Sequence, residues 1–271
     1  MTRKPVPNIL SIAGSDPSGG AGIQADLKAI SANGGYAMAA ITALTVQNTR
    51  GVGDVQLIAP GFVTAQLDAI FADIRVDAVK IGMLGDEAIT AAVARTLATQ
   101  DCPVVLDPVM VAKGGDRLLS RMAVRALCRD LLPLAHVITP NLPEAADLLS
   151  CPEARTRNQM EQQARDLLRL GPRAVLLKGG HLPGPESPDL LMTADQAIWF
   201  QAERIATRNS HGTGCTLSSA LAAQLGRGQD LPDACAAAKD YVGQALAAAD
   251  HLQVGQGIGP TDHFWMLRDG D

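Results

Sequence analysis

Short apolar runs alternate with helical patterns along most of this 271-residue chain. The runs have strand length and are apolar at consecutive positions, as in strands that are buried on both faces of a parallel sheet. The expected strands are residues 8–15, 38–46, 76–81, 104–106, 136–139 and 174–177. One helix is expected to begin at about Gly22, and three more are expected over residues 60–74, 87–98 and 120–131. This order predicts an α/β fold whose central sheet is mostly parallel and covered by helices on both faces.

The pattern changes after Lys178. Three short β-type runs follow, at residues 190–193, 197–200 and 204–206. They predict a short antiparallel extension at one edge of the sheet, and two long alanine-rich helices then close the fold. The Gly- and Pro-rich stretches at 181–188 and 254–260 have the length of surface loops. We therefore expect residues 1–271 to form a single domain.

Composition and charge restrict the classes of function that the chain can have. The net charge of −5 and the pI near 5.5 give no extended positive field, so we expect no nucleic-acid partner and only small bound phosphates. The scarcity of aromatic residues, at 3%, suits helices that lie close on a parallel sheet. The apolar run near the amino terminus is too short for a signal peptide or a membrane span, which predicts a cytoplasmic protein without a membrane partner.

The cysteines indicate neither a disulfide framework nor a structural metal site. There are five of them, an odd number, with no CxxC pair and no histidines at zinc-binding spacing. Four are interpreted as small core residues, namely Cys102, Cys128, Cys151 and Cys235. Cys215 stands in a different context.

Two glycine-rich segments follow expected strands, where open α/β sheets bind their ligands. Residues 13–22 form a strand-to-helix turn that can bring backbone amides to a ligand, with a flexible turn as the alternative; it matches neither a Walker A loop nor GxGxxG. Residues 209–216 lead into the helix expected over 217–226. Gly212, Thr213 and Gly214 can supply consecutive amides that hold a transferring phosphoryl group. An ordinary helix cap at Thr213 is the alternative.

Cys215 falls in the first turn of that helix. The positive end of a helix dipole lowers the pKa of a thiol, so the sequence predicts a thiolate that can accept or orient the proton of a substrate hydroxyl. The alternative is a small buried side chain that only packs the turn.

Further polar residues sit beyond other strands. Asn141 and Glu144 lie three apart at a helix start, a spacing that suits a hydrated Mg²⁺ and equally suits an ordinary capping arrangement. Lys178 can contact ATP phosphate as a point charge. Lys113 lies in a glycine-containing loop that can act as a lid. Lys80, between Val79 and Ile81, is interpreted as structural.

Seven segments in this order resemble the hydroxymethylpyrimidine/phosphomethylpyrimidine kinases of the ribokinase-like superfamily, nearly from end to end. They are AGSDPSGGAGIQADLKA at 13–29, ITALTVQNT at 41–49, KIGML at 80–84, LDPVMVAKGGD at 106–116, ITPNLPEA at 138–145, LLKGGHL at 176–182 and HGTGCTLSSALAA at 211–223. The superfamily commonly has an aspartate base where this chain, like the pyrimidine kinases, has Cys215.

The resemblance implies roles for individual residues. Cys215 would serve the substrate hydroxyl, the amides of residues 212–214 would form the anion hole, and Asn141 with Glu144 would manage Mg²⁺ through water. Gln47 would bind the aminopyrimidine, because its amide can accept from the 4-amino group and donate to the adjacent ring nitrogen. The pocket would be completed by Gly14, Ala21, Asp26 and Met83. The resemblance also implies a homodimer.

The implied reaction transfers the γ-phosphoryl group of ATP to 4-amino-5-hydroxymethyl-2-methylpyrimidine and then to its monophosphate, on the route to thiamine. Two other readings stay open. One is a pyridoxal kinase, which phosphorylates a hydroxymethyl group on a similar ring. The other is a non-catalytic protein that retains the fold and the pyrimidine pocket.

Overall fold

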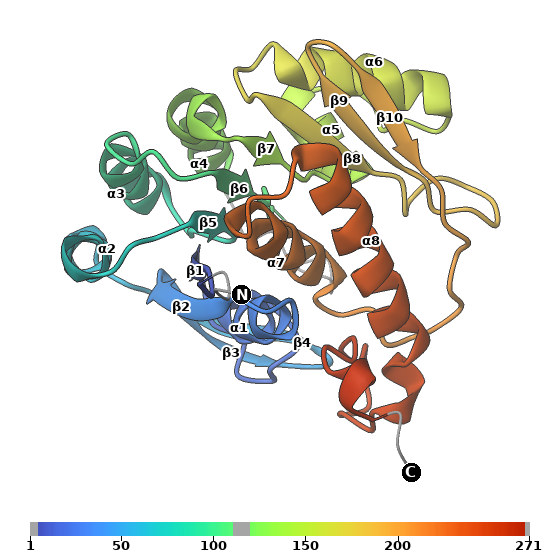
Figure 1. Ribbon diagram of the computed structural model, residues 1–271, viewed down its shortest axis with the longest axis horizontal. Helices are drawn as coiled ribbons and strands as arrows, with labels where there is room; N and C mark the ends of the chain where they lie inside the picture. Colours follow the sequence, from blue (N-terminus) through green and yellow to red (C-terminus); the bar gives the residue numbers. More distant parts are fainter. Residues whose placement is uncertain (1–4, 111–119, 269–271) are drawn as a thin grey trace.

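The computed structural model describes residues 5–110 and 120–268 and contains a central sheet of eight strands (Figure 1). The strands are β1 (Asn8–Ala13), β2 (Tyr36–Ile41), β5 (Ala78–Ile81), β6 (Val104–Leu106), β7 (Val137–Ile138), β8 (Ala174–Lys178), β9 (Asp189–Thr193) and β10 (Ala197–Phe200). Their order is β10-β9-β8-β7-β6-β5-β1-β2. The pairs from β2 to β8 are parallel, and β9 and β10 add in antiparallel fashion. The predicted mostly parallel sheet with an antiparallel edge is confirmed.

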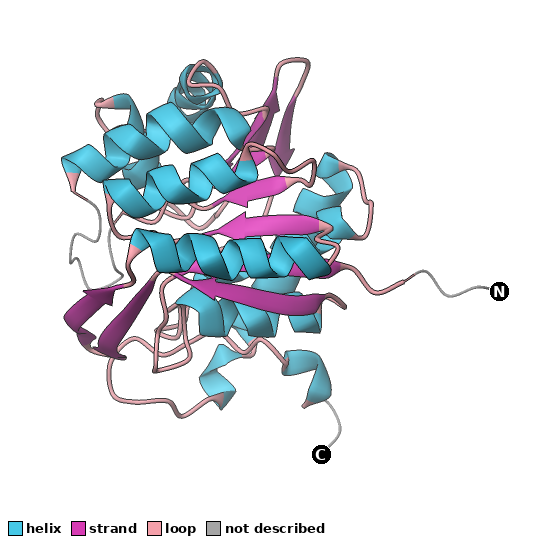
Figure 2. Cartoon of the chain, turned by 90° about the vertical axis from the view of Figure 1, so that its left-hand side faces the viewer, coloured by secondary structure: helices cyan, strands magenta, loops and turns pink. Residues whose placement is uncertain are grey.

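Helices cover both faces of this sheet (Figures 1 and 2). One face carries α1 (Gly22–Ala32), α7 (Thr213–Gly226) and α8 (Leu231–Ala247). The other carries α2 (Pro60–Asp73), α3 (Glu87–Leu97), α4 (Arg121–Ala126), α5 (Leu142–Leu149) and α6 (Arg157–Leu168). Side chains of β1 alternate between the two cores, with Ile9 on the α7 side and Leu10 and Ile12 on the other, all fully buried. Each such side chain stabilises the fold by about 1.5–3 kcal/mol, which makes the sheet a rigid base for its loops.

The run expected at 38–46 is not one strand. β2 ends at Ile41, and β3 (Ala43–Asn48) leaves the sheet to pair with β4 (Gly51–Leu57) in a separate two-stranded sheet (Figure 2). Thr42 fixes the break: its amide donates to the Ala13 carbonyl at 3.0 Å, and its hydroxyl donates to the Met83 carbonyl at 2.7 Å. This hairpin places the residues of β3 over the carboxyl end of β1.

One further local expectation is wrong. Residues 204–206 form no strand, because backbone pairing in this region is limited to an isolated bridge between Glu203 and Glu186, flanked by the Arg204 amide donating to Pro185 O at 2.7 Å. The Arg204 guanidinium donates to the carbonyls of Gly180, Leu182 and Gly184 at 2.6–3.0 Å and so braces the 181–188 loop. The helical stretch expected over 120–131 is confirmed: α4 spans Arg121–Ala126 after its N-cap Ser120, and a π-helical turn, Leu127–Leu131, continues it.

Three of the four cysteines interpreted as core residues are confirmed. Cys235 is buried, and Cys102 and Cys128 pack partly buried against the core. Cys151 differs, since it lines the cavity described in the next section and its sulfur accepts a hydrogen bond from the Gln163 amide at 3.3 Å.

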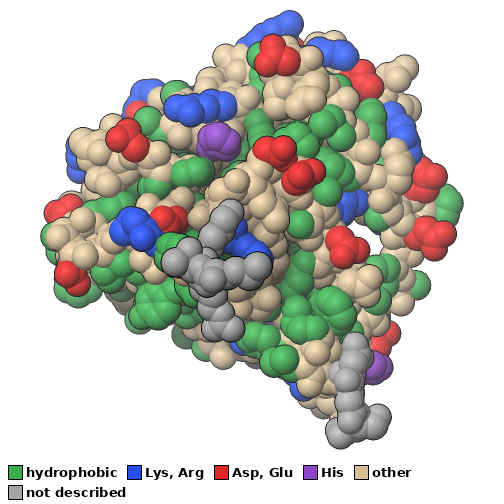
Figure 3. All heavy atoms as spheres, in the orientation of Figure 1, with side chains coloured by type: hydrophobic (Ala, Val, Ile, Leu, Met, Phe, Trp, Pro, Cys, Tyr) green, Lys and Arg blue, Asp and Glu red, His purple; other side chains and the backbone are tan. Residues whose placement is uncertain are grey.

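The surface carries both signs of charge. Acidic and basic side chains are interspersed on the face drawn in Figure 3. Within residues 5–110 and 120–268, no helix combines the length and the apolar character needed to cross a bilayer.

Candidate active site

A cavity of about 1330 Å³ opens beyond the carboxyl ends of the parallel strands. Gly14 follows β1, Met83 follows β5, Asp107 follows β6, Asn141 follows β7, and Lys178 ends β8, and all five line it. Because parallel strands end at one edge of a sheet, residues far apart in the chain meet there.

The cavity brings together most of the residues predicted from the sequence. Those that line it are Gly14, Ala21, Gln47, Met83, Asn141, Glu144, Lys178, Gly212, Thr213, Gly214 and Cys215. Lys113 lies outside the described residues.

Asp26 does not line the cavity, because it is fully buried behind the wall in an ion pair with Lys80. Lys80 Nζ lies 2.7 and 2.8 Å from the two Asp26 oxygens, which also accept from Ser11 and Ser219 hydroxyls at 2.5 and 2.8 Å. The carboxylate thus ties β1, α1, β5 and α7 together. This position gives Asp26 a structural role and no place in the cavity lining. Lys80, interpreted as structural, is fully buried in the same ion pair, although it also adjoins the cavity wall.

The start of α7 requires glycine. Gly212 is the N-cap residue at a φ of 78°, in the left-handed region, and a Cβ there would overlap the carbonyl oxygen of Gly20. No side chain caps the helix, and the Thr213 hydroxyl donates backwards to Ser210 O at 2.7 Å, so the alternative of a cap at Thr213 is wrong. The amide of Thr213 donates to Ser210 O at 3.4 Å, and Gly214 and Cys215 follow it in the first turn of this 14-residue helix. These residues line the cavity, so the positive end of the helix dipole lies at its wall.

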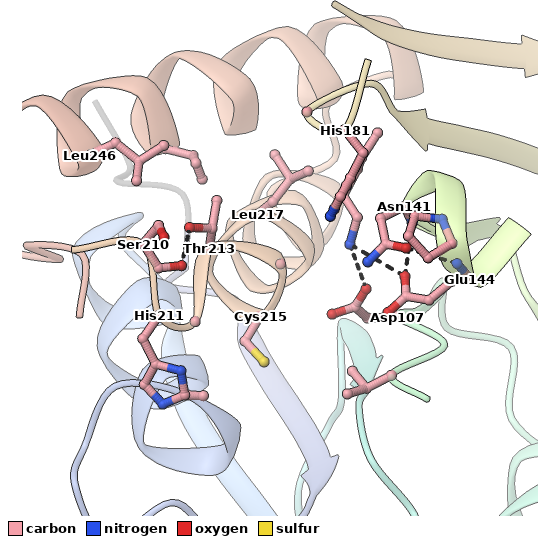
Figure 4. Close-up of a pocket in the computed structure, with 18 of the residues that line it drawn as sticks. Asp107, Asn141, Glu144, His181, Ser210, His211, Thr213, Cys215, Leu217 and Leu246 are labelled. Atoms are coloured by element: carbon pink, nitrogen blue, oxygen red, sulfur yellow. Dashed lines mark hydrogen bonds and ion pairs between the residues drawn. The ribbon is translucent and has the colours of Figure 1, made fainter. Parts of the chain in front are cut away.

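A buried cluster of charge lies beside this helix start (Figure 4). Lys178 Nζ is 3.0 Å from Asp107 Oδ1 and 4.0 Å from Glu144 Oε2. Asp107 also accepts from the hydroxyls of Thr139 at 3.0 Å and Ser218 at 3.5 Å. A Cβ on Gly214 would lie 3.1 Å from Lys178 Nζ, so the ammonium group sits directly against the start of α7. Cation and helix start can act on the same anion.

Asn141 and Glu144 form the capping arrangement that the sequence left open. Asn141 Oδ1 accepts from the Glu144 amide at 2.8 Å, and Glu144 Oε2 accepts from the Asn141 amide at 2.8 Å, which is a reciprocal capping box. Burial raises the pKa of Glu144 to about 7, although Lys178 acts in the opposite direction. Near neutral pH this carboxyl is therefore poised between its neutral and ionised forms.

Cys215 has the opposite pKa shift from the predicted one. Burial raises the pKa of its thiol to about 11, and the nearby Lys80 charge offsets only part of that effect. The sulfur nevertheless lines the cavity, between His211 and Asp107 in Figure 4. A helix start was expected to lower the pKa of this thiol, but desolvation by the surrounding protein is the larger effect, even though Cys215 stays partly exposed towards the cavity.

The opposite wall is built around Gln47. β3 places Gln47 over the turn after β1, and its side chain is half-buried. Below it, a Cβ on Gly14 would lie only 2.7 Å from Met83 Cε, so glycine leaves room for the methionine to form an apolar floor. An amide beside an apolar floor suits a flat heterocycle with polar edges.

Sequence reasoning gave no role to several polar residues of the cavity, among them Asp16, Asp107 and His211. Asp107 directly follows a strand, so the rule applied to Asn141 also covered it. Asp16 and His211 stand inside the two glycine-rich turns that were singled out, but only the glycines and amides of those turns were given roles.

Comparison with known proteins settles the family. The profile described as phosphomethylpyrimidine kinase matches residues 16–262. The chain belongs to the phosphomethylpyrimidine kinase family. It is 56% identical over 258 residues to the hydroxymethylpyrimidine/phosphomethylpyrimidine kinase of Escherichia coli strain K12, covering 95% of this chain and 97% of that protein.

Solved structures of kinases share the fold of this phosphomethylpyrimidine kinase family member. The Bacillus subtilis pyridoxal kinase in complex with ADP superposes with a TM-score of 0.89 at 36% identity, covering 97% of this chain and 99% of the other. The Clostridium difficile phosphomethylpyrimidine kinase gives 0.79 at 40% identity, covering 89% and 99%. The predicted ribokinase-like fold and family are confirmed.

Proposed function

We propose that this protein transfers the γ-phosphoryl group of ATP to the hydroxymethyl group of 4-amino-5-hydroxymethyl-2-methylpyrimidine and then phosphorylates the monophosphate, a step of thiamine biosynthesis. The observation that carries the proposal is one cavity with two unlike walls. One wall has the start of α7 and Lys178, which suit phosphate, and the other has Gln47 and Met83, which suit an aminopyrimidine. Family membership supports the same reaction.

The residues of the wall that suits phosphate have different roles in the transfer. The amides at the start of α7 stabilise negative charge where it develops on the moving phosphoryl group. Lys178 supplies a fixed positive charge, and Asp107, 3.0 Å away, holds its ammonium in place. Cys215 orients the substrate hydroxyl, and its thiolate form accepts the hydroxyl proton to become a thiol as the bond from the hydroxyl oxygen to phosphorus forms and the bond to ADP breaks.

We also propose Mg²⁺ as a cofactor. Asp107 and Glu144 lie on either side of Lys178 and give the cavity carboxylate oxygens, the ligand type that Mg²⁺ prefers. Glu144 already accepts from a backbone amide, which suits contact through water rather than direct coordination. Bound there, the ion would neutralise nucleotide phosphate charge.

Phosphorus NMR of a reaction with ATP, Mg²⁺ and the aminopyrimidine alcohol tests the proposed function. We expect a monophosphate resonance, followed by the diphosphate of the same ring. A spectrum in which ATP stays intact or is only hydrolysed contradicts the proposal.

A second candidate is pyridoxal kinase activity, favoured by the structural similarity to the Bacillus subtilis pyridoxal kinase. Comparing kcat/KM for pyridoxal and for the aminopyrimidine alcohol decides between them. A clear preference for pyridoxal would overturn the substrate assignment but not the assignment as a kinase.

A homodimer in the cytoplasm remains a prediction, and light scattering coupled to gel filtration measures the oligomeric state.

Gln47→Ala should raise KM for the aminopyrimidine about tenfold, because two hydrogen bonds to the ring are lost. KM for ATP should change less than twofold, since the wall that suits phosphate is untouched. Gln56→Ala on β4 is the matched control, because its exposed side chain does not line the cavity. A larger effect on ATP than on the pyrimidine would remove Gln47 from the substrate site.

The pKa of Glu144 predicts a pH dependence. Because the carboxyl has a pKa of about 7 in the fold, raised from 4.5, it is mostly protonated at pH 6 and mostly ionised at pH 8. The ionised form attracts hydrated Mg²⁺, so KM for MgATP should fall several-fold over this range. Glu144→Gln should remove that dependence, and an unchanged slope in the variant would assign it to another group.

A further inference from the structure

A buried histidine–carboxylate pair adjoins Gln47 and has no part in the phosphoryl transfer described above. Asp16 follows β1 and His211 precedes α7, and they are 2% and 8% exposed. His211 Nε2 lies 2.7 Å from Asp16 Oδ2 and 3.4 Å from Gln47 Nε2. A single ring nitrogen thus faces both the carboxylate and the amide.

The Asp16 carboxylate determines which ring nitrogen of His211 carries a hydrogen. Asp16 Oδ1 accepts from the amide and the hydroxyl of Ser18 at 2.9 and 2.7 Å, and Oδ2 accepts from the Ala21 amide at 2.8 Å. Burial alone would raise the pKa of Asp16, but the hydrogen bonds from His211 and Ser18 outweigh burial and lower it. An ionised carboxylate only accepts, so His211 Nε2 must carry a hydrogen directed at Asp16.

That hydrogen in turn constrains the amide. In the structure the NH₂ group of Gln47 faces His211 and the amide oxygen faces Thr45. A protonated ring nitrogen has no lone pair, so that NH₂ group cannot donate to it; turning the amide by 180° exchanges its two ends in place and directs the oxygen towards the ring N–H, which is the stable order. Thr45, the other neighbour of the Gln47 amide, does not oppose this orientation. The Thr45 hydroxyl, 3.4 Å from the amide, has one hydrogen and donates it to Ser15 O at 2.9 Å.

We propose that Asp16 and His211 act as a positioning pair that fixes the donor–acceptor order of the Gln47 amide and so makes the site select a 4-amino over a 4-oxo pyrimidine. This inference rests on the proposed function. A 4-amino ring presents a donor beside an acceptor nitrogen, whereas a 4-oxo ring presents an acceptor beside an N–H donor. A freely flipping amide matches both rings, and a fixed amide matches one and leaves the other with unpaired polar groups.

Kinetics with matched substrates test the pair. The ratio of kcat/KM for 5-hydroxymethyl-2-methylpyrimidines bearing 4-amino and 4-oxo groups would be measured in the native protein, Asp16→Asn and His211→Phe. The ratio should fall at least about tenfold in both variants, which corresponds to one hydrogen bond, while KM for ATP changes less than twofold. His251→Asn, at an exposed position away from the cavity, is the control that should keep the native ratio. Equal losses for both rings would show a merely structural role and overturn the proposal.

Nitrogen-15 NMR of the histidine rings gives a readout that does not depend on turnover. In the native protein, the signals missing from His211→Phe should show a protonated Nε2 at neutral pH, and a bare Nε2 would overturn the proposal even if a variant failed to fold. A native enzyme that phosphorylates neither ring would contradict the proposed function, while the ring spectrum would still decide the state of the pair.

Discussion

Lys178→Met should lower kcat about 10²- to 10³-fold, the loss typical of removing one group that stabilises transition-state charge. Lys178 Nζ is the cation against the start of α7, and its removal takes away the ammonium charge beside Asp107 and Glu144, so more of their negative charge faces the phosphates. The two carboxyls would then repel the nucleotide, so KM for ATP should rise as well. Steady-state kinetics with saturating aminopyrimidine and varied MgATP measures both effects.

Two controls separate this chemistry from a loss of folding. Lys178→Arg keeps the charge but spreads it over a planar group, so it should recover only part of the rate. Arg125→Met removes an exposed charge from α4, away from the cavity, and should leave kcat unchanged. If Lys178→Met melts like the native protein and retains kcat within threefold, Lys178 has no role in transfer.

The sheet could be predicted because its strands are buried on both faces. Residues 174–177 therefore form an unbroken apolar run, and residues 76–81 form an apolar run that only Asp77 and Lys80 interrupt; β8 and β5 lie within or beside these runs. The β3–β4 hairpin could not be predicted in this way. Its two strands leave the sheet at Thr42, and β4 consists mainly of glycine and polar residues whose side chains are exposed, so no burial pattern marks it.

The active site was predictable only as far as local signals reach. Glycine-rich turns and polar residues after strands are visible in a single stretch of sequence, and they led to Lys178, Asn141 and residues 212–215. Pairings between distant positions are not visible in this way. Asp107 meets Lys178 across 71 positions, and Asp16 meets His211 across 195.

Burial explains why two expectations about the site, for Asp26 and for the pKa of Cys215, differ from the structure. The family resemblance implied that Asp26 helps to complete the pocket, but α1 directs it into the core, where it pairs with Lys80. The helix start at Cys215 was expected to lower the pKa of the thiol. Desolvation is the larger effect there, and only the packed structure shows how much protein surrounds the sulfur.

Cys215→Ala should lower kcat about 10²-fold, at the low end of the range for general base catalysis, because a dissociative transition state needs the hydroxyl proton removed late. KM for the aminopyrimidine should stay within about threefold, since Gln47 supplies the ring contacts and the thiol acts mainly in the transition state.

The pKa of about 11 adds a second expectation for the same residue. Only a small fraction of the thiol is ionised at neutral pH, so the native kcat should rise between pH 7 and pH 9, and Cys215→Ala should show no such rise. Cys215→Ser is the matched control: it keeps a hydrogen-bonding group of similar shape, but a hydroxyl does not ionise in this range, so it should recover the orientation of the substrate hydroxyl without the pH-dependent increase in kcat. A native pH profile that persists in Cys215→Ala would show that another group accepts the proton and that the thiol only packs the turn.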